Sequence, residues 1–259
     1  MQKITTRKIL SKKNKTPIIC LTAYSKSIAQ IADKYCDIIL VGDSLGMVLY
    51  GMKTTREVKI DQMISHGRAV KKFVKKSLVV LDMPYRTYTN KSVAYKNAKK
   101  VINLTGCDAI KLEGGKKIAK IIKYLVNKGI PVMGHVGLLP QSSTNFKLKG
   151  KNFYEQQKIL QDAIAVSNSG AFSMVIECVV ESLAKKITKS VSIPTIGIGA
   201  SKYCDGQILV IDDMLGLSDY YPKFVKKYTS LKKIMENSIN RYVKDVKSRK
   251  FPYNANVYK

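Results

Sequence analysis

Short apolar runs alternate with longer amphipathic stretches along most of this 259-residue chain. The runs are rich in Ile, Val and Leu, and uninterrupted runs of this length are typical of strands buried on both faces. Flanking turn residues set their limits. We therefore expect strands at 18–21, 38–41, 78–81, 109–112, 132–133, 174–176, 195–198 and 207–211.

The segments between these runs repeat apolar residues at helical spacing, which predicts helices at 25–34, 92–105, 116–128, 155–169 and 183–190. Several of them end at a glycine, as at Gly106, Gly129 and Gly170, which is a common stop signal for a helix. Eight strands separated by helices predict a parallel (β/α)8 barrel, the TIM barrel, followed by extra C-terminal helices between 223 and 247. An open, doubly wound sheet is the alternative fold.

No Pro-, Gly- or Ser-rich linker divides the chain, so we expect residues 1–259 to form a single domain. The five cysteines are odd in number and show no CxxC spacing, which argues against a disulfide framework or a zinc site. The Lys-rich N-terminus has no apolar core of a signal peptide, and no apolar stretch is long enough for a membrane span. These features predict a cytoplasmic protein with no membrane partner.

The net charge of +28 raises the question of a nucleic-acid partner. However, only 6 of the 46 basic residues are Arg, the residue that base-edge and bidentate phosphate recognition favours, and the lysines are scattered along the chain. We interpret the charge mainly as a compositional bias and predict no nucleic-acid partner. Attraction of anionic ligands remains the alternative role.

Acidic residues follow three of the predicted strands. Asp43 comes after 38–41, Asp82 after 78–81 and Glu113 after 109–112. The carboxyl ends of parallel strands meet at one edge, so the three carboxylates should converge there, and converging carboxylates need a compensating cation or proton. Their hard oxygen atoms predict a divalent metal site that suits Mg²⁺.

Other charged residues belong to the same edge. Lys111 lies two residues before Glu113, so both side chains should share a face of the strand, where Lys111 would pair with Glu113 or with a substrate carboxylate. His135 follows the fifth predicted strand and is either a core histidine or a functional group. Glu177 follows an apolar run, where partial burial would make it a competent general base.

The motifs around these residues resemble the ketopantoate hydroxymethyltransferase family and occur in the family's order. They are VGDSLG at 41–46, DMP at 82–84, KLEGG at 111–115, GHVGLLPQS at 134–142, IECV at 176–179, IGIGA at 196–200 and CDGQILV at 204–210. The resemblance implies a TIM barrel of the phosphoenolpyruvate/pyruvate type and a homodecamer. It also implies transfer of a one-carbon unit from 5,10-methylenetetrahydrofolate to 3-methyl-2-oxobutanoate, which gives 2-dehydropantoate and tetrahydrofolate in pantothenate and coenzyme A biosynthesis.

The resemblance also implies roles for individual residues. Asp43, Asp82 and Glu113 correspond to the Mg²⁺ site, directly or through water, and Glu177 corresponds to the proposed base. The 2-oxo acid would be bound by the residues that match the family's substrate contacts, which are Asp43, Ser44, Asp82 and Lys111, while His135 would lie near the substrate or the folate.

The chain departs from the family's pattern at several positions, among them Arg86, which adds a charge close to Asp82. None of these departures removes a proposed ligand or base. The alternative function is another Mg²⁺-dependent lyase or mutase that acts on a 2-oxo acid with the same barrel. Those relatives commonly carry a catalytic cysteine in a flexible loop, which the sequence does not show.

Overall fold

The computed structural model describes residues 2–143 and 146–258 and divides into two compact units, one up to Val210 and one from Ile211 onward. The barrel lies within the first unit. The expectation that residues 1–259 form one domain stays a prediction.

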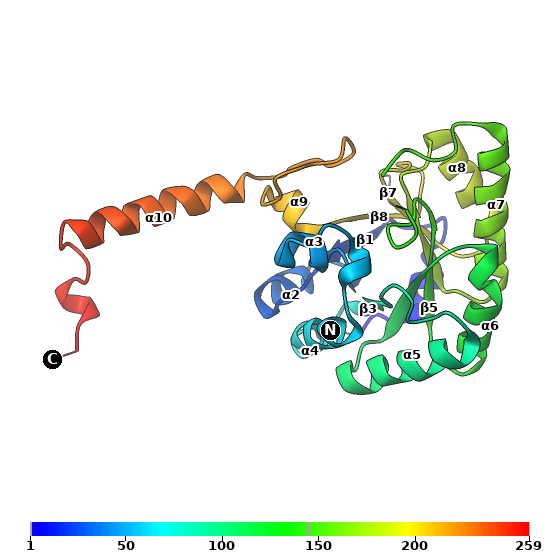
Figure 1. Ribbon diagram of the computed structural model, residues 1–259, viewed down its shortest axis with the longest axis horizontal. Helices are drawn as coiled ribbons and strands as arrows, with labels where there is room; N and C mark the ends of the chain where they lie inside the picture. The colour runs from blue at the N-terminus through cyan, green and yellow to red at the C-terminus, as the bar shows by residue number, and fades with distance from the viewer. Residues whose placement is uncertain (1, 144–145, 259) are drawn as a thin grey trace. The chain divides into compact units, whose positions relative to one another are not determined.

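The first unit is a closed barrel in which each strand pairs in parallel with the next and β1 pairs with β8 (Figure 1). Its strands are β1 (Ile18–Thr22), β2 (Ile38–Val41), β3 (Leu78–Asp82), β4 (Ala109–Glu113), β5 (Val132–Gly137), β6 (Ser173–Glu177), β7 (Thr195–Ile198) and β8 (Gly206–Leu209). The predicted (β/α)8 barrel is therefore confirmed, and the open sheet is excluded.

Helices follow the strands and cover the outside of the barrel, as Figure 1 shows for α4 to α8. The helices of this unit are α1 (Thr6–Leu10), α2 (Lys26–Ala32), α3 (Leu45–Tyr50), α4 (Ile60–Lys71), α5 (Lys91–Thr105), α6 (Ala119–Asn127), α7 (Phe153–Asn168) and α8 (Glu181–Ser190), with the short 3-10 helices η1 (Thr55–Glu57) and η2 (Lys116–Ile118). Their buried faces are the apolar stripes expected from the sequence; α6, for example, buries Ile121, Ile122 and Leu125.

Local signals explain where the longer helices begin and end. The side chain of Asn90 caps α5 by accepting a 2.9 Å hydrogen bond from Val93 N, and Gly106 ends the helix in the left-handed conformation at φ 71°. Asn152 caps α7 in the same way, through Glu155 N at 2.9 Å. The structure thus bears out the predicted helix at 92–105 and its glycine stop.

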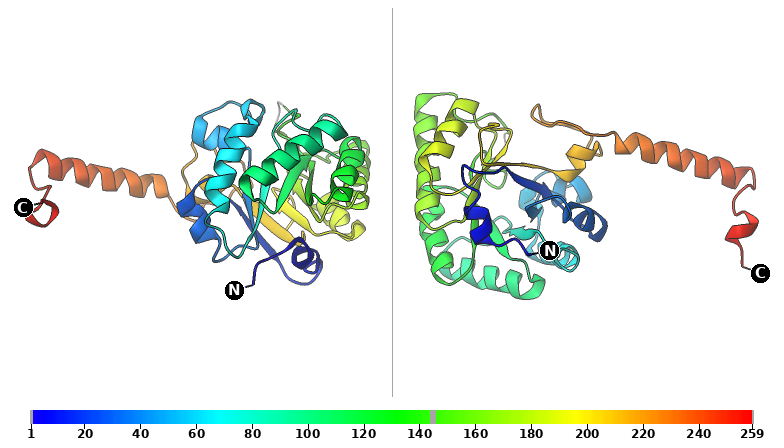
Figure 2. Two further views of the ribbon diagram at one scale, coloured as in Figure 1. Left: turned by 90° about the horizontal axis from the view of Figure 1, so that it is seen from below. Right: turned by 180° about the vertical axis from the view of Figure 1, so that it is seen from behind.

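The interior of the barrel is filled from alternate strand positions, since successive side chains of a strand point to opposite faces. Ile18, Ile38 and Leu78 belong to this core at the amino ends of their strands. Ile4 and Ile9 pack into the same cluster and are almost fully buried. They belong to the N-terminal segment around α1, which Figure 2 draws in dark blue. The N-terminal segment therefore fills the end of the barrel opposite to the strand-ending acids.

The register of the strands brings the charged residues to one edge. Asp82 pairs with Lys111 across β3 and β4, and Glu113 pairs with His135 across β4 and β5. At the next interface, Gly137 pairs with Glu177. Gly137 has φ 96°, and a Cβ there would lie 2.4 Å from the backbone oxygen of Glu177, so only glycine allows this approach of β5 to β6.

The second unit contains α9 (Ile211–Leu215), α10 (Leu231–Lys247) and the 3-10 helix η3 (Asn254–Asn256). The predicted C-terminal helix at 223–247 is wrong at its start, because the structure is irregular from 223 to Ser230, which directly precedes α10. The predicted last strand is wrong at its end, since β8 stops at Leu209 and Ile211 begins α9. None of the helices in the described ranges is both long and apolar enough to cross a membrane.

Candidate active site

The sequence-predicted residues lie at the carboxyl edge of the barrel. Asp82, Glu113 and Glu177 are the last residues of β3, β4 and β6, while Asp43 and Ser44 follow β2 by two and three residues. Lys111 and His135 project from within β4 and β5. A TIM barrel places its chemistry at this face, because side chains from several strands meet there.

Lys111 is the centre of the cluster and is only 5% exposed. Its Nζ lies 3.1 Å from Asp82 Oδ1 and 3.2 Å from His135 Nδ1. Burial alone would lower the pKa of this ammonium, but Asp82, Glu113 and Asp43 more than offset it and hold the pKa of Lys111 above its usual range. Lys111 is therefore a fixed positive charge among the three acids.

Asp43 and Asp82 are a closely placed, buried pair. The backbone N–H of Asp43 donates to Asp82 Oδ2 at 3.1 Å, and both side chains are at most 4% exposed. Burial raises the pKa of both carboxyls, and for Asp43 the neighbouring charges of Asp82 and Glu113 add to it. Asp82 Oδ1 receives no hydrogen bond of normal geometry from any residue that the structure describes.

His135 lies between two carboxylates. Its Nδ1 is 3.5 Å from Glu113 Oε1, and its Nε2 is 3.2 Å from Glu177 Oε2. Burial and the charge of Lys111 favour the neutral ring, but Glu113 and Glu177 favour the imidazolium and raise the pKa of His135 to about 9. His135 is thus both buried and in contact with two acids of the cluster, and its functional role stays a prediction.

Glu113 is held as a carboxylate by its neighbours. Burial alone would raise its pKa, but the hydrogen bond and charge of His135, together with Lys111 and the backbone N–H of Gln141, lower it. Glu177 is more accessible, with 16% of its side chain exposed. Of the carboxylates in the cluster, Glu177 thus offers the oxygen atoms that a bound molecule can approach.

Gln141 is a site residue that sequence reasoning missed, although it lies in one of the recognised motifs. It is 2% exposed, and its Nε2 donates to Asp43 Oδ2 at 2.7 Å and to Met83 O at 2.9 Å. Its backbone N–H donates to Glu113 Oε2 at 3.0 Å, and its Oε1 accepts from the Tyr88 hydroxyl. No signal in a single sequence shows that this loop residue returns to the acids.

Ser44 lies at the rim of the cluster. It directly precedes α3, and its Oγ lies 2.8 Å from the hydroxyl of Tyr24, a second residue that the sequence did not single out. Ser44 is half-buried, so its hydroxyl is available to a molecule that enters from the carboxyl face. The structure therefore brings all seven sequence-predicted residues to one end of the barrel.

One known protein family matches nearly the whole chain. The family model described as ketopantoate hydroxymethyltransferase matches residues 3–254. The chain belongs to this family. The 3-methyl-2-oxobutanoate hydroxymethyltransferase of Pelagibacter ubique (strain HTCC1062) is 55% identical over 96% of this chain and 97% of its own length. The enzyme of the same name from Bartonella quintana (strain Toulouse) is 51% identical over 100% of this chain and 96% of its own length.

Solved structures of other proteins have the same fold as this member of the ketopantoate hydroxymethyltransferase family. A phosphonopyruvate hydrolase aligns over 100% of this chain and 92% of its own, with a TM-score of 0.66 and 10% identity. A phosphoenolpyruvate phosphomutase from Streptomyces platensis subsp. rosaceus aligns with a TM-score of 0.64 and 9% identity, over 94% of this chain and 88% of its own. At these identities the likeness concerns the barrel alone. The predictions of the family, of a hydroxymethyltransferase and of a TIM barrel are confirmed.

The donor set of the cluster fits a hydrated divalent cation. In the described parts of the chain, no three His, Cys, Asp or Glu side chains are grouped closely enough to hold a metal ion by themselves. Mg²⁺, however, usually keeps several waters and takes one or two carboxylates. Two buried acids with raised pKa values share the single ammonium of Lys111, and a divalent cation would compensate the charge that Lys111 leaves.

Proposed function

We propose that this chain catalyses transfer of a one-carbon unit from 5,10-methylenetetrahydrofolate to 3-methyl-2-oxobutanoate, giving 2-dehydropantoate and tetrahydrofolate. The observation that carries the proposal is the row formed by Lys111, His135 and Glu177, in which two cationic groups lie beside an accessible carboxylate. Membership of the ketopantoate hydroxymethyltransferase family supports it.

The 2-oxo acid needs a binding site for two kinds of oxygen, those of its carboxylate and that of its ketone. Lys111 supplies a buried ammonium, and Ser44 supplies a hydroxyl at the rim. A buried ammonium binds a carboxylate or a polarised carbonyl more strongly than one in water, because the surrounding dielectric is low. We assign Lys111 and Ser44, with Asp43 and Asp82, to binding of this substrate.

The reaction begins with loss of the proton on C3, next to the ketone. Glu177 is assigned as the base, since its carboxylate faces the cluster and stays accessible. The negative charge that develops on the ketone oxygen is stabilised by Lys111 and by protonated His135. His135 Nε2 also lies 3.2 Å from Glu177 Oε2, and this ion-pair contact would favour the position of the base beside the cluster.

A metal ion would strengthen this stabilisation. We assign Asp43, Asp82 and Glu113 to Mg²⁺, directly or through water, where the ion would act as a Lewis acid toward the developing negative charge. One carbon–nitrogen bond of methylenetetrahydrofolate breaks to give an iminium, and carbon–carbon bond formation then joins C3 to its methylene carbon. One water supplies the hydroxyl oxygen of the product as the second carbon–nitrogen bond breaks. The electron pairs of both broken bonds stay on the folate nitrogens, which take up the proton removed from C3 and one proton of the water.

The proposal extends to the setting of the enzyme. We propose methylenetetrahydrofolate as co-substrate and Mg²⁺ as cofactor. We also propose that the chain forms a homo-oligomer, which the family resemblance predicts to be a decamer, and that the enzyme is cytoplasmic. Nucleic acid and membrane are not among the proposed partners.

Two measurements on the full-length protein test the function and the base. Product formation from 3-methyl-2-oxobutanoate should require both methylenetetrahydrofolate and Mg²⁺. Exchange of the C3 proton with solvent, followed by NMR without folate, should slow by about 10²–10⁴-fold in Glu177→Gln, because the variant cannot accept the proton. Glu181→Gln, an exposed change at the start of α8, is the matched control and should exchange normally.

The two outcomes are separable. If the wild type forms no folate-dependent product, the assigned reaction is wrong whatever the variants do. If the wild type forms product but Glu177→Gln exchanges the C3 proton at the wild-type rate, another group is the base.

A further inference from the structure

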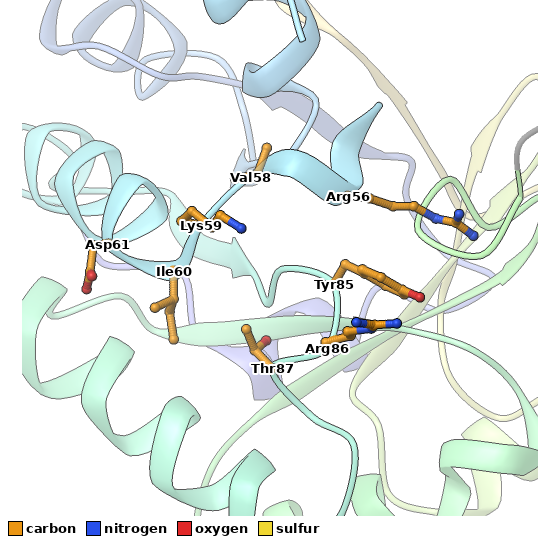
Figure 3. A pocket seen from close by; sticks show the side chains of 8 residues that line it. All are labelled: Arg56, Val58, Lys59, Ile60, Asp61, Tyr85, Arg86 and Thr87. Carbon is orange, nitrogen blue, oxygen red and sulfur yellow. The ribbon is translucent and has the colours of Figure 1, made fainter. Parts of the chain in front are cut away.

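A pocket of about 520 Å³ opens next to the cluster of acids, in the region between η1 and the loop after β3 (Figure 3). Its lining residues come from two segments of the chain and are Arg56, Val58, Lys59, Ile60, Asp61, Tyr85, Arg86 and Thr87. The volume lies in the usual range for small-molecule sites. None of the residues assigned to the proton transfer or to the metal lines it.

The pocket carries an excess of positive charge. Arg56, Lys59 and Arg86 line it, and none of them forms an ion pair with a carboxylate in the described parts of the chain. The one acid of the lining, Asp61, pairs with Lys100 at 2.8 Å, and Figure 3 shows its side chain away from the two arginines. A cationic pocket in which Arg56, Lys59 and Arg86 have no carboxylate partner favours an anionic ligand.

The two arginines are arranged around one aromatic ring. The Cζ atoms of Arg56 and Arg86 lie 5.1 Å and 5.2 Å from the centre of the Tyr85 ring, within the range of a cation–π contact. Arg86 has φ 64°, an uncommon conformation for a residue with a side chain. Stacking on Tyr85 limits the movement of both guanidinium groups, so their donors are preorganised for carboxylate oxygens.

The pocket is joined to the acids through Gln141. Arg56 Nε donates to Gln141 O at 2.8 Å, while the side chain of Gln141 donates to Asp43 Oδ2 at 2.7 Å. In the other segment, Arg86 follows Asp82 by four residues. A molecule that reacts at the acids and extends along this wall would therefore bring its far end to the arginines.

We propose that this pocket binds the glutamyl carboxylates of the folate co-substrate, with Arg56, Lys59 and Arg86 as the anion-binding groups. The inference rests on the proposed function. A folate carries its transferable carbon at the pterin end and its carboxylates on the glutamyl end, which matches a reacting cluster flanked by a cationic pocket. The arginines supply paired donors that suit carboxylates, and the ammonium of Lys59 adds a further positive charge.

The test compares folates that differ only in the glutamyl part, using full-length protein. For wild type, we expect tetrahydrofolate with a poly-γ-glutamate chain to bind more tightly than the monoglutamate, with an affinity that falls as salt is added. In Arg86→Gln, and separately in Lys59→Gln, we expect the KM for methylenetetrahydrofolate to rise about tenfold, because a charge-assisted contact is lost. The KM for 3-methyl-2-oxobutanoate should stay unchanged.

Arg68→Gln is the matched control, because Arg68 is an exposed arginine of α4 that does not line the pocket. It removes the same charge and should leave the folate KM unaltered. Gln is as unbranched as Arg, so Arg86→Gln adds no new strain at the left-handed position. Circular dichroism and thermal unfolding establish that each variant is folded.

The inference is overturned if the wild type is active and the Arg86→Gln, Lys59→Gln double variant has the same KM for methylenetetrahydrofolate. It is also overturned if a folate that lacks the glutamyl group binds as well as the complete one. The double variant could instead keep the wild-type folate KM but no longer bind inorganic phosphate or short duplex DNA. That result would also overturn the inference and would assign the pocket to other anions. Absence of any folate-dependent product in the wild type would instead contradict the proposed function.

Discussion

Gln141 shows how a single loop residue determines the positions of two acids. Its side chain donates to Asp43 Oδ2 at 2.7 Å, and its backbone N–H donates to Glu113 Oε2 at 3.0 Å. Both carboxylates are buried, so they have few other donors, and hydrogen bonds to charged acceptors are the stronger kind. Gln141 is therefore a positioning residue, which acts on the reaction through Asp43 and Glu113.

Truncation of this side chain should slow the reaction. In Gln141→Ala we expect kcat and the C3 exchange rate to fall about 10-fold to 100-fold, since a hydrogen bond to a charged group contributes about 1.5–3 kcal/mol. Gln141→Glu should lose activity at neutral pH, because the new carboxylate faces Asp43, and regain part of it at lower pH as that group binds a proton. Gln156→Ala on α7 is the control; equal losses in all variants would point to a general structural effect.

Asp82 has a pKa raised by burial, and its Oδ1 forms an ion pair with Lys111 at 3.1 Å. Asp82→Asn leaves the buried ammonium of Lys111 without this carboxylate, so the variant should have a lower melting temperature in EDTA. We expect the same variant to bind Mg²⁺ about tenfold or more weakly by titration calorimetry and to lose metal-dependent turnover. The exposed Asp61→Asn on α4 should leave the Mg²⁺ affinity unchanged. Wild-type Mg²⁺ affinity in Asp82→Asn would remove Asp82 from the metal site.

At the scale of the elements, the sequence predicts what depends on local pattern. The apolar runs of β2 and β7 coincide with the observed strands, and the acid that ends each of β3, β4 and β6 was recognised as a site residue. Strand β5 was predicted as 132–133 only, because Gly134 and His135 interrupt its apolar run; pairing with β4 and β6 extends it to Gly137. Propensity cannot show such an extension, since it is fixed by neighbouring strands.

The loops set the limit of prediction for the site. Gln141 and Tyr88 lie in connections after β5 and β3, and their contacts depend on the path that each loop takes back over the barrel. The pocket around Tyr85 has the same origin, because its two walls come from segments that are far apart in the sequence. Strand-end residues are predictable from periodicity, whereas residues placed by loop paths need the structure.

Asp205 links three elements at the amino end of the barrel. Its carboxylate accepts hydrogen bonds of 2.8 Å from Lys13 Nζ, Asn14 N and Thr195 N, and so connects the N-terminal segment with β7 and the start of β8. Burial alone would raise the pKa of Asp205, but the hydrogen bonds from Lys13, Thr195 and Asn14 lower it below the usual range. A lowered pKa means that the ionised carboxylate stabilises the folded state.

Asp205→Asn should therefore destabilise the protein by about 2 kcal/mol at pH 7, measured by urea unfolding. This stabilisation is fully present above the unfolded-state pKa of about 3.9 and is lost as the pH falls through the lower folded-state value. The difference between wild type and variant should thus persist at pH 5 and shrink only in stronger acid. Asp61→Asn, whose partner Lys100 is also exposed, should cost less than about 1 kcal/mol. A pH-independent difference would show that shape, not charge, matters at Asp205.

At the scale of the whole molecule, the net charge of +28 bears on assembly. Ion pairs in the described part of the chain involve only a minority of the 46 basic residues, so most of the charge is uncompensated. Copies that come together in the proposed homo-oligomer must therefore overcome mutual repulsion. Dissolved salt weakens that repulsion, since the Debye length falls from about 30 Å at 0.01 M to about 8 Å at 0.15 M ionic strength.

We expect the mean mass in sedimentation velocity experiments to rise between these two ionic strengths at constant protein concentration. Sucrose at equal osmolality is the control, because it favours burial of surface without screening charge and should not reproduce the full effect of salt. An oligomer that dissociates as salt is added would instead mean that attraction between opposite charges, and not burial of apolar surface, holds the copies together.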